Sequence, residues 1–164
     1  MTIFVKNKHT LQIDEFKFKC CIGKKGSTNN KKEGDGKTPK GTFEIENLYF
    51  RKDRIKKPVT LLKCIEIKKV MGWCDDTYFP NKYNKLIKIE KGIKHEKLKR
   101  KDNKYDLLIP IKYNYIKPVT GLGSCIFIHL TKNYKPTAGC IALKEKDFLI
   151  MLKLIKKNSK IKIF

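Results

Sequence analysis

The sequence predicts a mainly β fold, a β-rich α+β domain of mixed sheets or a sandwich with one helix near the C-terminus. Most of its apolar runs are short and alternate with polar residues, as half-buried strands do. Apolar side chains recur at helical spacing only over residues 145–158. The length fits one domain, and no repeat or boundary divides it, so we expect a single domain over residues 1–164.

The expected strands follow one another along the chain with two interruptions. Residues 2–5 and 10–13 predict a hairpin around a polar turn. Residues 23–41 are polar and rich in glycine, which indicates a long ordered loop or a flexible linker. Residues 70–104 show no regular pattern, and we expect them to be irregular. The remaining expected strands are residues 16–22, 42–50, 61–67, 107–113, 125–130, 140–143 and 160–164.

The chain is strongly basic, with a formal net charge of +23. Such a charge suggests a polyanionic partner, either nucleic acid or an acidic membrane surface. Only Arg51, Arg54 and Arg100 are arginines, however, whereas nucleic-acid readers usually depend on bidentate arginine contacts. The lysines are spread along the whole chain. We interpret the charge as background with weak attraction to acidic material, and we expect no specific nucleic-acid partner.

Membrane, export and metal signals are missing from the sequence. No apolar run approaches the roughly 20 residues that span a bilayer. A charge at Lys6 interrupts the N-terminal apolar run, so no signal peptide is expected, which favours the cytoplasm. The six cysteines include no Cys-x-x-Cys pair, and His9, His95 and His129 are far apart. We therefore expect free thiols and no metal site.

Residues 125–130 place a histidine on the face of a strand that points away from the core. Alternation puts Ile126, Ile128 and Leu130 on one aliphatic face. That face is the better core face, so His129 lies on the opposite side, toward solvent or a groove.

Cys140 follows the same logic in a second expected strand. Ile141 and Leu143 form its core face, which leaves Cys140 on the opposite side with Ala142. If the two strands are neighbours, about 4.8 Å apart, the sulfur and the His129 imidazole can come within hydrogen-bonding reach. That proximity is what a thiol needs to become a thiolate near neutral pH and act as a nucleophile.

The residues before Cys140 predict a tight turn. Pro136 is followed by three small residues, Thr137, Ala138 and Gly139. Gly139 permits a backbone conformation that other residues avoid. Such a turn can aim the N–H groups of Gly139 and Cys140 at one point, as an oxyanion hole requires. A strand cysteine is more often a packed core residue, so from spacing alone a packing role and a catalytic pair both stay open.

These motifs resemble those of the YkuD-type L,D-transpeptidase family. The family pattern has a histidine, then serine or threonine, a variable residue and Gly-Cys; the matching residues are His129, Thr137, Ala138, Gly139 and Cys140. A Thr-Pro-x-Gly-x-Phe element of the family corresponds to residues 38–43. Further matches, to a proteobacterial subgroup, are residues 72–76, 83–84, 100, 105–107 and 113–114.

The chain departs from the commonest family pattern in three ways. Ala138 stands where a second histidine usually precedes Gly-Cys, and Ala142 stands where an arginine or asparagine is frequent. The interval between His129 and Cys140 is short, which indicates a trimmed loop over the site. The nucleophile and the base are retained, so these departures bear on which acyl donor is selected.

The resemblance implies a YkuD-like fold and a cysteine acyltransferase without metal or organic cofactor. Cys140 would attack a carbonyl of a peptidoglycan stem peptide and pass the thioester to an amine on a second stem peptide. His129 would be the base, with its other nitrogen held by a backbone carbonyl. The residues expected to line the substrate cleft are Trp73, Arg100, Tyr113 and Asn114, although each could instead support the fold.

The resemblance also implies partners and leaves alternatives. Stem peptides would be donor and acceptor, carbapenem-type inhibitors are possible ligands, and a monomer is expected. The family's substrate would place the enzyme in the periplasm or the cell wall. With water as the acceptor, the same pair would make a peptidoglycan peptidase or amidase. A non-enzymatic polyanion binder, suggested by the charge alone, is the third hypothesis.

Overall fold

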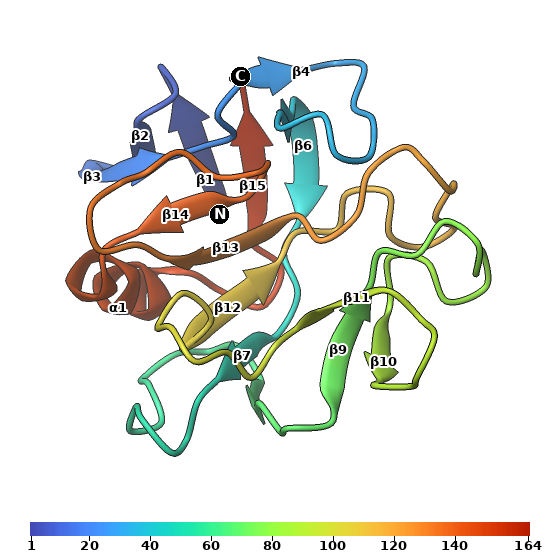
Figure 1. The fold of residues 1–164 in the computed structure, drawn as a ribbon. Helices are drawn as coiled ribbons and strands as arrows, with labels where there is room; N and C mark the ends of the chain where they lie inside the picture. The colour runs from blue at the N-terminus through green and yellow to red at the C-terminus, as the bar shows by residue number, and fades with distance from the viewer.

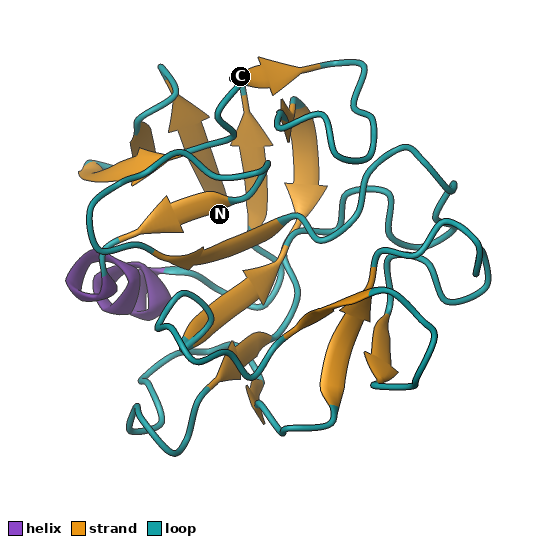
Figure 2. Cartoon of the chain, in the orientation of Figure 1, coloured by secondary structure: helices purple, strands orange, loops and turns teal.

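The computed structural model describes residues 1–164 and is mostly β with one helix, as the sequence predicts (Figures 1 and 2). The strands are β1 Thr2–Lys6, β2 Thr10–Ile13, β3 Phe16–Cys21, β4 Ser27–Thr28, β5 Thr38–Pro39, β6 Gly41–Glu44, β7 Leu48–Phe50, β8 Cys64–Glu66, β9 Met71–Cys74, β10 Leu86–Lys88, β11 His95–Lys97, β12 Leu107–Pro110, β13 Phe127–Leu130, β14 Ile141–Leu143 and β15 Lys160–Ile163. The helix is α1 Glu145–Leu154. It is too short to cross a membrane, and no other helix is present.

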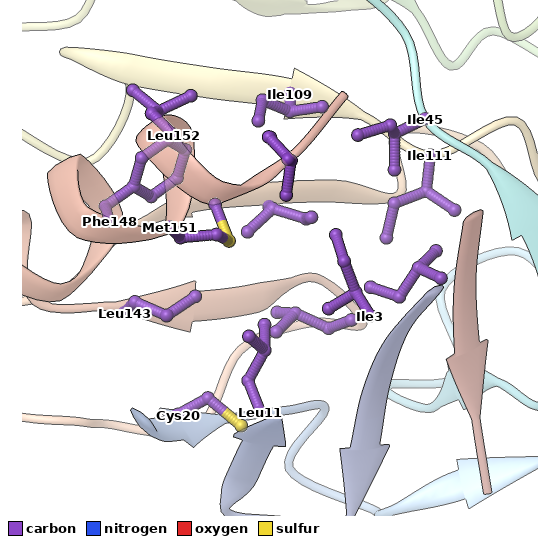
Figure 3. Packing of buried hydrophobic residues seen from close by; sticks show 14 of the residues in the cluster. Ile3, Leu11, Cys20, Ile45, Ile109, Ile111, Leu143, Phe148, Met151 and Leu152 are labelled. Carbon is purple, nitrogen blue, oxygen red and sulfur yellow. The ribbon is translucent and has the colours of Figure 1, made fainter. Parts of the chain in front are cut away.

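Ten of the strands form one mixed, curled sheet in the order β6-β15-β1-β2-β3-β14-β13-β12-β7-β8 (Figure 1). The pairs β1–β15, β13–β14 and β7–β8 are parallel, and the other neighbours are antiparallel. The main hydrophobic core lies inside the curl, where alternate residues of these strands meet. Helix α1 adds Phe148, Met151 and Leu152 to this core (Figure 3).

The two central strands β13 and β14 have the faces that alternation predicts. They pair in parallel, with Ile128 opposite Ile141. Both isoleucines belong to the main core, whereas Phe127 and Cys140 belong to a second, smaller cluster on the other side of the sheet. The segregation of aliphatic residues from the cysteine is therefore confirmed.

Residues 42–50 do not form the single strand that was expected. They divide into β6, which pairs with β15, and β7, which pairs with β12 and β8. In a flat sheet, eight interstrand spacings of about 4.8 Å would separate β6 from β7 by roughly 38 Å. The four Cα steps from Glu44 to Leu48 reach at most about 15 Å. The sheet must therefore curl, and Ile45 bridges to Ile111 at the join.

Residues 70–104 were expected to be irregular, and this expectation is wrong in part. They contain a separate three-stranded antiparallel sheet in the order β10-β9-β11. Its strands have only three or four residues each, too few for alternation to be recognised. The sheet covers the second cluster with Trp73.

The end of the helix and the glycine-rich loop also differ from or refine the predictions. The helix ends at Leu154 instead of residue 158, because Ile155 is extended at φ −75° and ψ 151° while its side chain stays in the core. Residues 23–41 form an ordered loop instead of a flexible linker. Within this loop β4 and β5 pair in parallel, and the Asp35 carboxylate accepts the backbone N–H groups of Lys32 and Lys37.

Candidate active site

Cys140 lies immediately before β14, on the face opposite the main core. Its Sγ donates to the carbonyl oxygen of Cys125 at 3.1 Å and accepts the N–H of Phe127 at 3.4 Å. The residue is 9% exposed and lines a cleft of about 600 Å³. All six cysteines are free, so the sulfur is not held in a disulfide. The thiol is largely buried, but it is reached from the cleft.

His129 lies in β13 on the same face, and it lines the same cleft. Its Nδ1 is 2.9 Å from the carbonyl oxygen of Leu130. A carbonyl oxygen can only accept a hydrogen bond, so Nδ1 carries the proton and Nε2 holds the basic lone pair. The only buried side-chain polar atoms without a partner are Asp75 Oδ1 and His95 Nε2, so the unpartnered Nε2 of His129 is open to the cleft.

The strand register places the Cys140 thiol and the His129 imidazole on the same face of the sheet, but no hydrogen bond joins them. His129 is opposite Ala142, and Cys140 precedes Ile141, which is opposite Ile128. The thiol and the imidazole are therefore on one face of adjacent strands, displaced diagonally. They make no direct hydrogen bond, because the thiol donates to Cys125 instead.

Burial keeps both groups neutral in the free protein. It raises the pKa of Cys140 to about 12, although the N–H of Phe127 acts in the opposite direction. Burial also lowers the pKa of His129 to about 4, and the positive charges of Lys104 and Arg100 act in the same direction. The expected thiolate is therefore absent at neutral pH. The site holds a neutral thiol and a neutral imidazole on the same face of the sheet.

The turn before Cys140 is held by Thr137. The Thr137 hydroxyl accepts the N–H of Gly139 at 3.1 Å and donates to the carbonyl oxygen of Cys140 at 2.6 Å. The Gly139 N–H is thus engaged and does not join the N–H of Cys140 in the arrangement expected for an oxyanion hole. The Cys140 N–H has no partner in the chain. Ala138 lines the cleft beside this turn.

The Thr-Pro element fixes the turn from the opposite side. The fully buried Thr38 hydroxyl accepts the N–H of Gly23 at 2.9 Å and donates to the carbonyl oxygen of Gly139 at 2.8 Å. Gly139 has a φ of +153°, and a Cβ there would lie 2.8 Å from the carbonyl oxygen of Lys37. The glycine at this position is required by that close approach of two backbones.

Of the residues expected to line the cleft, the structure brings Arg100 to it and buries Trp73. Arg100 uses Nε and Nη2 to hold Asp102, at 2.9 and 2.7 Å, and it stacks on Tyr105 at 5.0 Å. Arg100 lines the cleft, and its Nη1 makes no hydrogen bond within the chain. Trp73 is 1% exposed and packs edge-on against Phe127 beneath the site.

Tyr113 and Asn114 do not line the cleft and hold a neighbouring loop. Tyr113 donates its hydroxyl to the carbonyl oxygen of Leu122 at 2.6 Å. The side chain of Asn114 bonds the backbone of Val119 and Gly123. Both side chains therefore shape residues 115–123, which lead into the strand of His129.

Asn84 connects the three-stranded sheet to the cysteine, a role that the sequence did not indicate beyond the subgroup match at residues 83–84. Its Oδ1 accepts the indole N–H of Trp73 at 2.9 Å and the N–H of Cys125 at 3.1 Å. Its Nδ2 donates to the carbonyl oxygens of Tyr113 and Asn114. Since the carbonyl oxygen of Cys125 accepts the Cys140 thiol, Asn84 holds the backbone that positions the sulfur.

We expect Asn84→Ala to lower the free energy of unfolding by about 3 kcal/mol, because one buried and three partly buried hydrogen bonds are lost. The left-handed backbone at this position, with a φ of 54°, is a further cost for alanine. Urea denaturation of both proteins measures the loss. Asn81→Ala is the control, since the Asn81 side chain is exposed and makes no hydrogen bond. Equal stability of the two variants would contradict this role.

Tyr105 and Glu96 are further cleft residues that the residue patterns did not assign. The Tyr105 ring meets His129 edge-on, with centroids 5.4 Å apart. Its hydroxyl donates to Glu96 at 2.6 Å. The sequence indicated Tyr105 only through the match of residues 105–107 to the family subgroup, and it gave no signal for Glu96. No group of three His, Cys, Asp or Glu side chains is arranged to hold a metal ion.

Comparison with protein families matches residues 1–163 to YkuD, described as the L,D-transpeptidase catalytic domain. No curated protein sequence matches the chain. A solved structure, that of Bdellovibrio bacteriovorus Bd1075, is similar at 16% identity with a TM-score of 0.44. The match covers 99% of this chain and 47% of that one, so the chain spans about half the length of Bd1075. Because the family match extends over nearly all residues, the chain belongs to the YkuD family of L,D-transpeptidase catalytic domains.

Proposed function

We propose that this chain is a peptidoglycan L,D-transpeptidase that joins stem peptides through a thioester on Cys140, with His129 as general base. The family assignment supports an enzyme of this kind with peptidoglycan substrates. The observation that carries the proposal is the Nδ1 contact of His129. By bonding the Leu130 carbonyl, it leaves Nε2 unprotonated in the cleft that also holds the Cys140 thiol.

In the first step the Cys140 sulfur attacks the carbonyl carbon of the donor peptide. His129 Nε2 takes the thiol proton during the attack, because neither group is charged beforehand. The Cys140 N–H faces the developing oxyanion. Collapse breaks the C–N bond, and the imidazolium returns the proton to the leaving amine. The thioester remains on Cys140.

In the second step an amine of another stem peptide attacks the thioester. His129 takes a proton from this amine, a new amide bond forms, and the sulfur leaves and recovers a proton. Arg100 is proposed to contact a carboxylate of a peptide through its free Nη1. Trp73, Tyr113 and Asn114 are proposed to act by supporting the cleft, since their polar groups are engaged within the chain.

Incubation with isolated sacculi, followed by muropeptide analysis, tests the proposal. Transfer to an amine produces crosslinked dimers, and these are the expected products. Hydrolysis by the same pair would instead produce shortened monomers, which would make the protein a peptidase. An unchanged muropeptide profile, together with no adduct on Cys140 from tetrapeptide or carbapenem, would contradict both readings.

A further inference from the structure

Lys31 is the one buried lysine of this basic chain. Its side chain is 3% exposed, and its Nζ donates to the carbonyl oxygen of Lys32 at 2.7 Å and to Asp35 Oδ1 at 2.6 Å. These bonds hold the ammonium group in a fixed position. An ammonium group has three N–H donors, so one donor of Lys31 has no partner within the chain.

Lys31 and Cys140 line the same cleft. The aliphatic part of the Lys31 side chain packs against the backbone of Gly123. A Cβ at Gly123 would lie only 2.9 Å from Lys31 Cγ. Gly123 has a φ of +101°, which also favours glycine. The loop of residues 23–41 and the loop before β13 thus bring a buried cation to the cleft that holds the thiol.

The turn before Cys140 offers one backbone N–H to an oxyanion, whereas the expected oxyanion hole has two. The Gly139 N–H is bound to Thr137, so the Cys140 N–H is the backbone donor that remains. The sulfur is neutral at rest, and attack on a carbonyl therefore creates new negative charge inside a buried site. Such charge is stabilised by preorganised hydrogen-bond donors or a fixed positive group beside it.

The electrostatic surroundings of the sulfur single out Lys31. Its positive charge lowers the pKa of Cys140, whereas burial, Glu96 and Cys21 raise it. Two other cations of the cleft, Arg100 and Lys104, act on His129. Lys94 is paired with Asp75, and its side chain is 71% exposed. Lys132 and Lys135, the remaining cations of the cleft, are exposed.

We propose that Lys31 is a further catalytic residue, whose free N–H binds the carbonyl oxygen of the donor peptide as that oxygen becomes negative. The inference rests on the proposed function, because it needs Cys140 as the nucleophile. Lys31 takes the place of the second oxyanion donor that Gly139 does not supply. Asp35 holds the ammonium group in place through a carboxylate that two backbone N–H groups also fix.

The test compares Lys31→Met with Lys40→Met, which removes the same charge from an exposed position outside the cleft. The rate of Cys140 acylation by a carbapenem is followed by intact-protein mass spectrometry. We expect Lys31→Met to lower this rate by roughly 100-fold, as the loss of one oxyanion donor does, and Lys40→Met to leave it unchanged. The carbapenem concentration that gives half the maximal rate should stay the same in both variants.

Lys31→Met leaves Asp35 without its counter-ion, so the double variant Lys31→Met/Asp35→Asn provides a second test that removes both charges. It should show the same loss of acylation rate while retaining the thermal unfolding midpoint. A folded double variant that acylates at the wild-type rate would overturn the inference.

Alkylation of Cys140 by iodoacetamide, measured by peptide mapping, needs no peptidoglycan and separates the two proposals. Alkylation displaces iodide and forms no oxyanion, so we expect Lys31→Met to lose far less in alkylation rate than in carbapenem acylation rate, and Lys40→Met to change neither. A loss of alkylation as large as the loss of acylation would overturn the inference, whereas a wild type that is alkylated at Cys140 but acylated by no donor would contradict the proposed function alone.

Discussion

Cys140→Ala is expected to abolish formation of the thioester adduct completely. The proposed chemistry has no other group that can take the place of the sulfur, and the loss of a nucleophile typically costs several orders of magnitude in rate. Intact-protein mass spectrometry after incubation with a carbapenem or a tetrapeptide donor measures the adduct. The substitution should preserve the fold, because the side chain it shortens lies at the cleft and outside the main core.

Two other cysteines provide the comparison. Cys64→Ala should leave the adduct unchanged, since Cys64 is half-buried on β8 and does not line the cleft. Cys125 is the rival, because it lines the cleft next to Cys140. An adduct that persists in Cys140→Ala and disappears in Cys125→Ala would transfer the nucleophilic role to Cys125 and refute the proposed assignment.

His129→Gln is expected to lower the acylation rate by roughly 10³-fold, which is within the usual range for a general base. Glutamine is close in size, so the variant should fold. In the wild type the pH profile should have its acidic limb near pH 4, because the pKa of His129 is lowered to about 4. The imidazole is therefore already in its basic form above this pH, and the rate rises as the pH increases through 4.

The acylation rate measured between pH 3 and 8 checks this expectation. His9→Gln is the matched control, because His9 is exposed and lies on the N-terminal hairpin. A limb centred near pH 6.5 would show that the base is more exposed to water than the structure places it. A profile that His129→Gln leaves unchanged in shape and height would remove His129 from the mechanism.

The central part of the fold and the two groups of the candidate site followed from the sequence. Residues 125–130 and 141–143 alternate cleanly, and each strand has one aliphatic face against the core. A one-residue shift of register would bury the wrong face, so the pattern fixes which side chains face the cleft. The alternation alone therefore places Cys140 and His129 on a common face.

The rest depended on contacts between distant segments. No glycine or proline marks the break at residues 45–47, so β6 and β7 read as one strand. The engagement of the Gly139 N–H required the position of the Thr137 hydroxyl, and the burial of Lys31 required the packing of two loops far apart in the chain. In a chain this rich in lysine, no sequence pattern distinguishes one buried ammonium group from the exposed ones.

The short join between β6 and β7 ties the two margins of the ten-stranded sheet together covalently. The connection of residues 45–47 keeps the first edge strand, β6, close to β7 near the other edge. β13 and β14 lie in the middle of the strand order, several neighbours away from β6 and β8 at the two ends. Local unfolding at the edge strands therefore leaves the pairing of β13 with β14 intact, and with it the common face of Cys140 and His129.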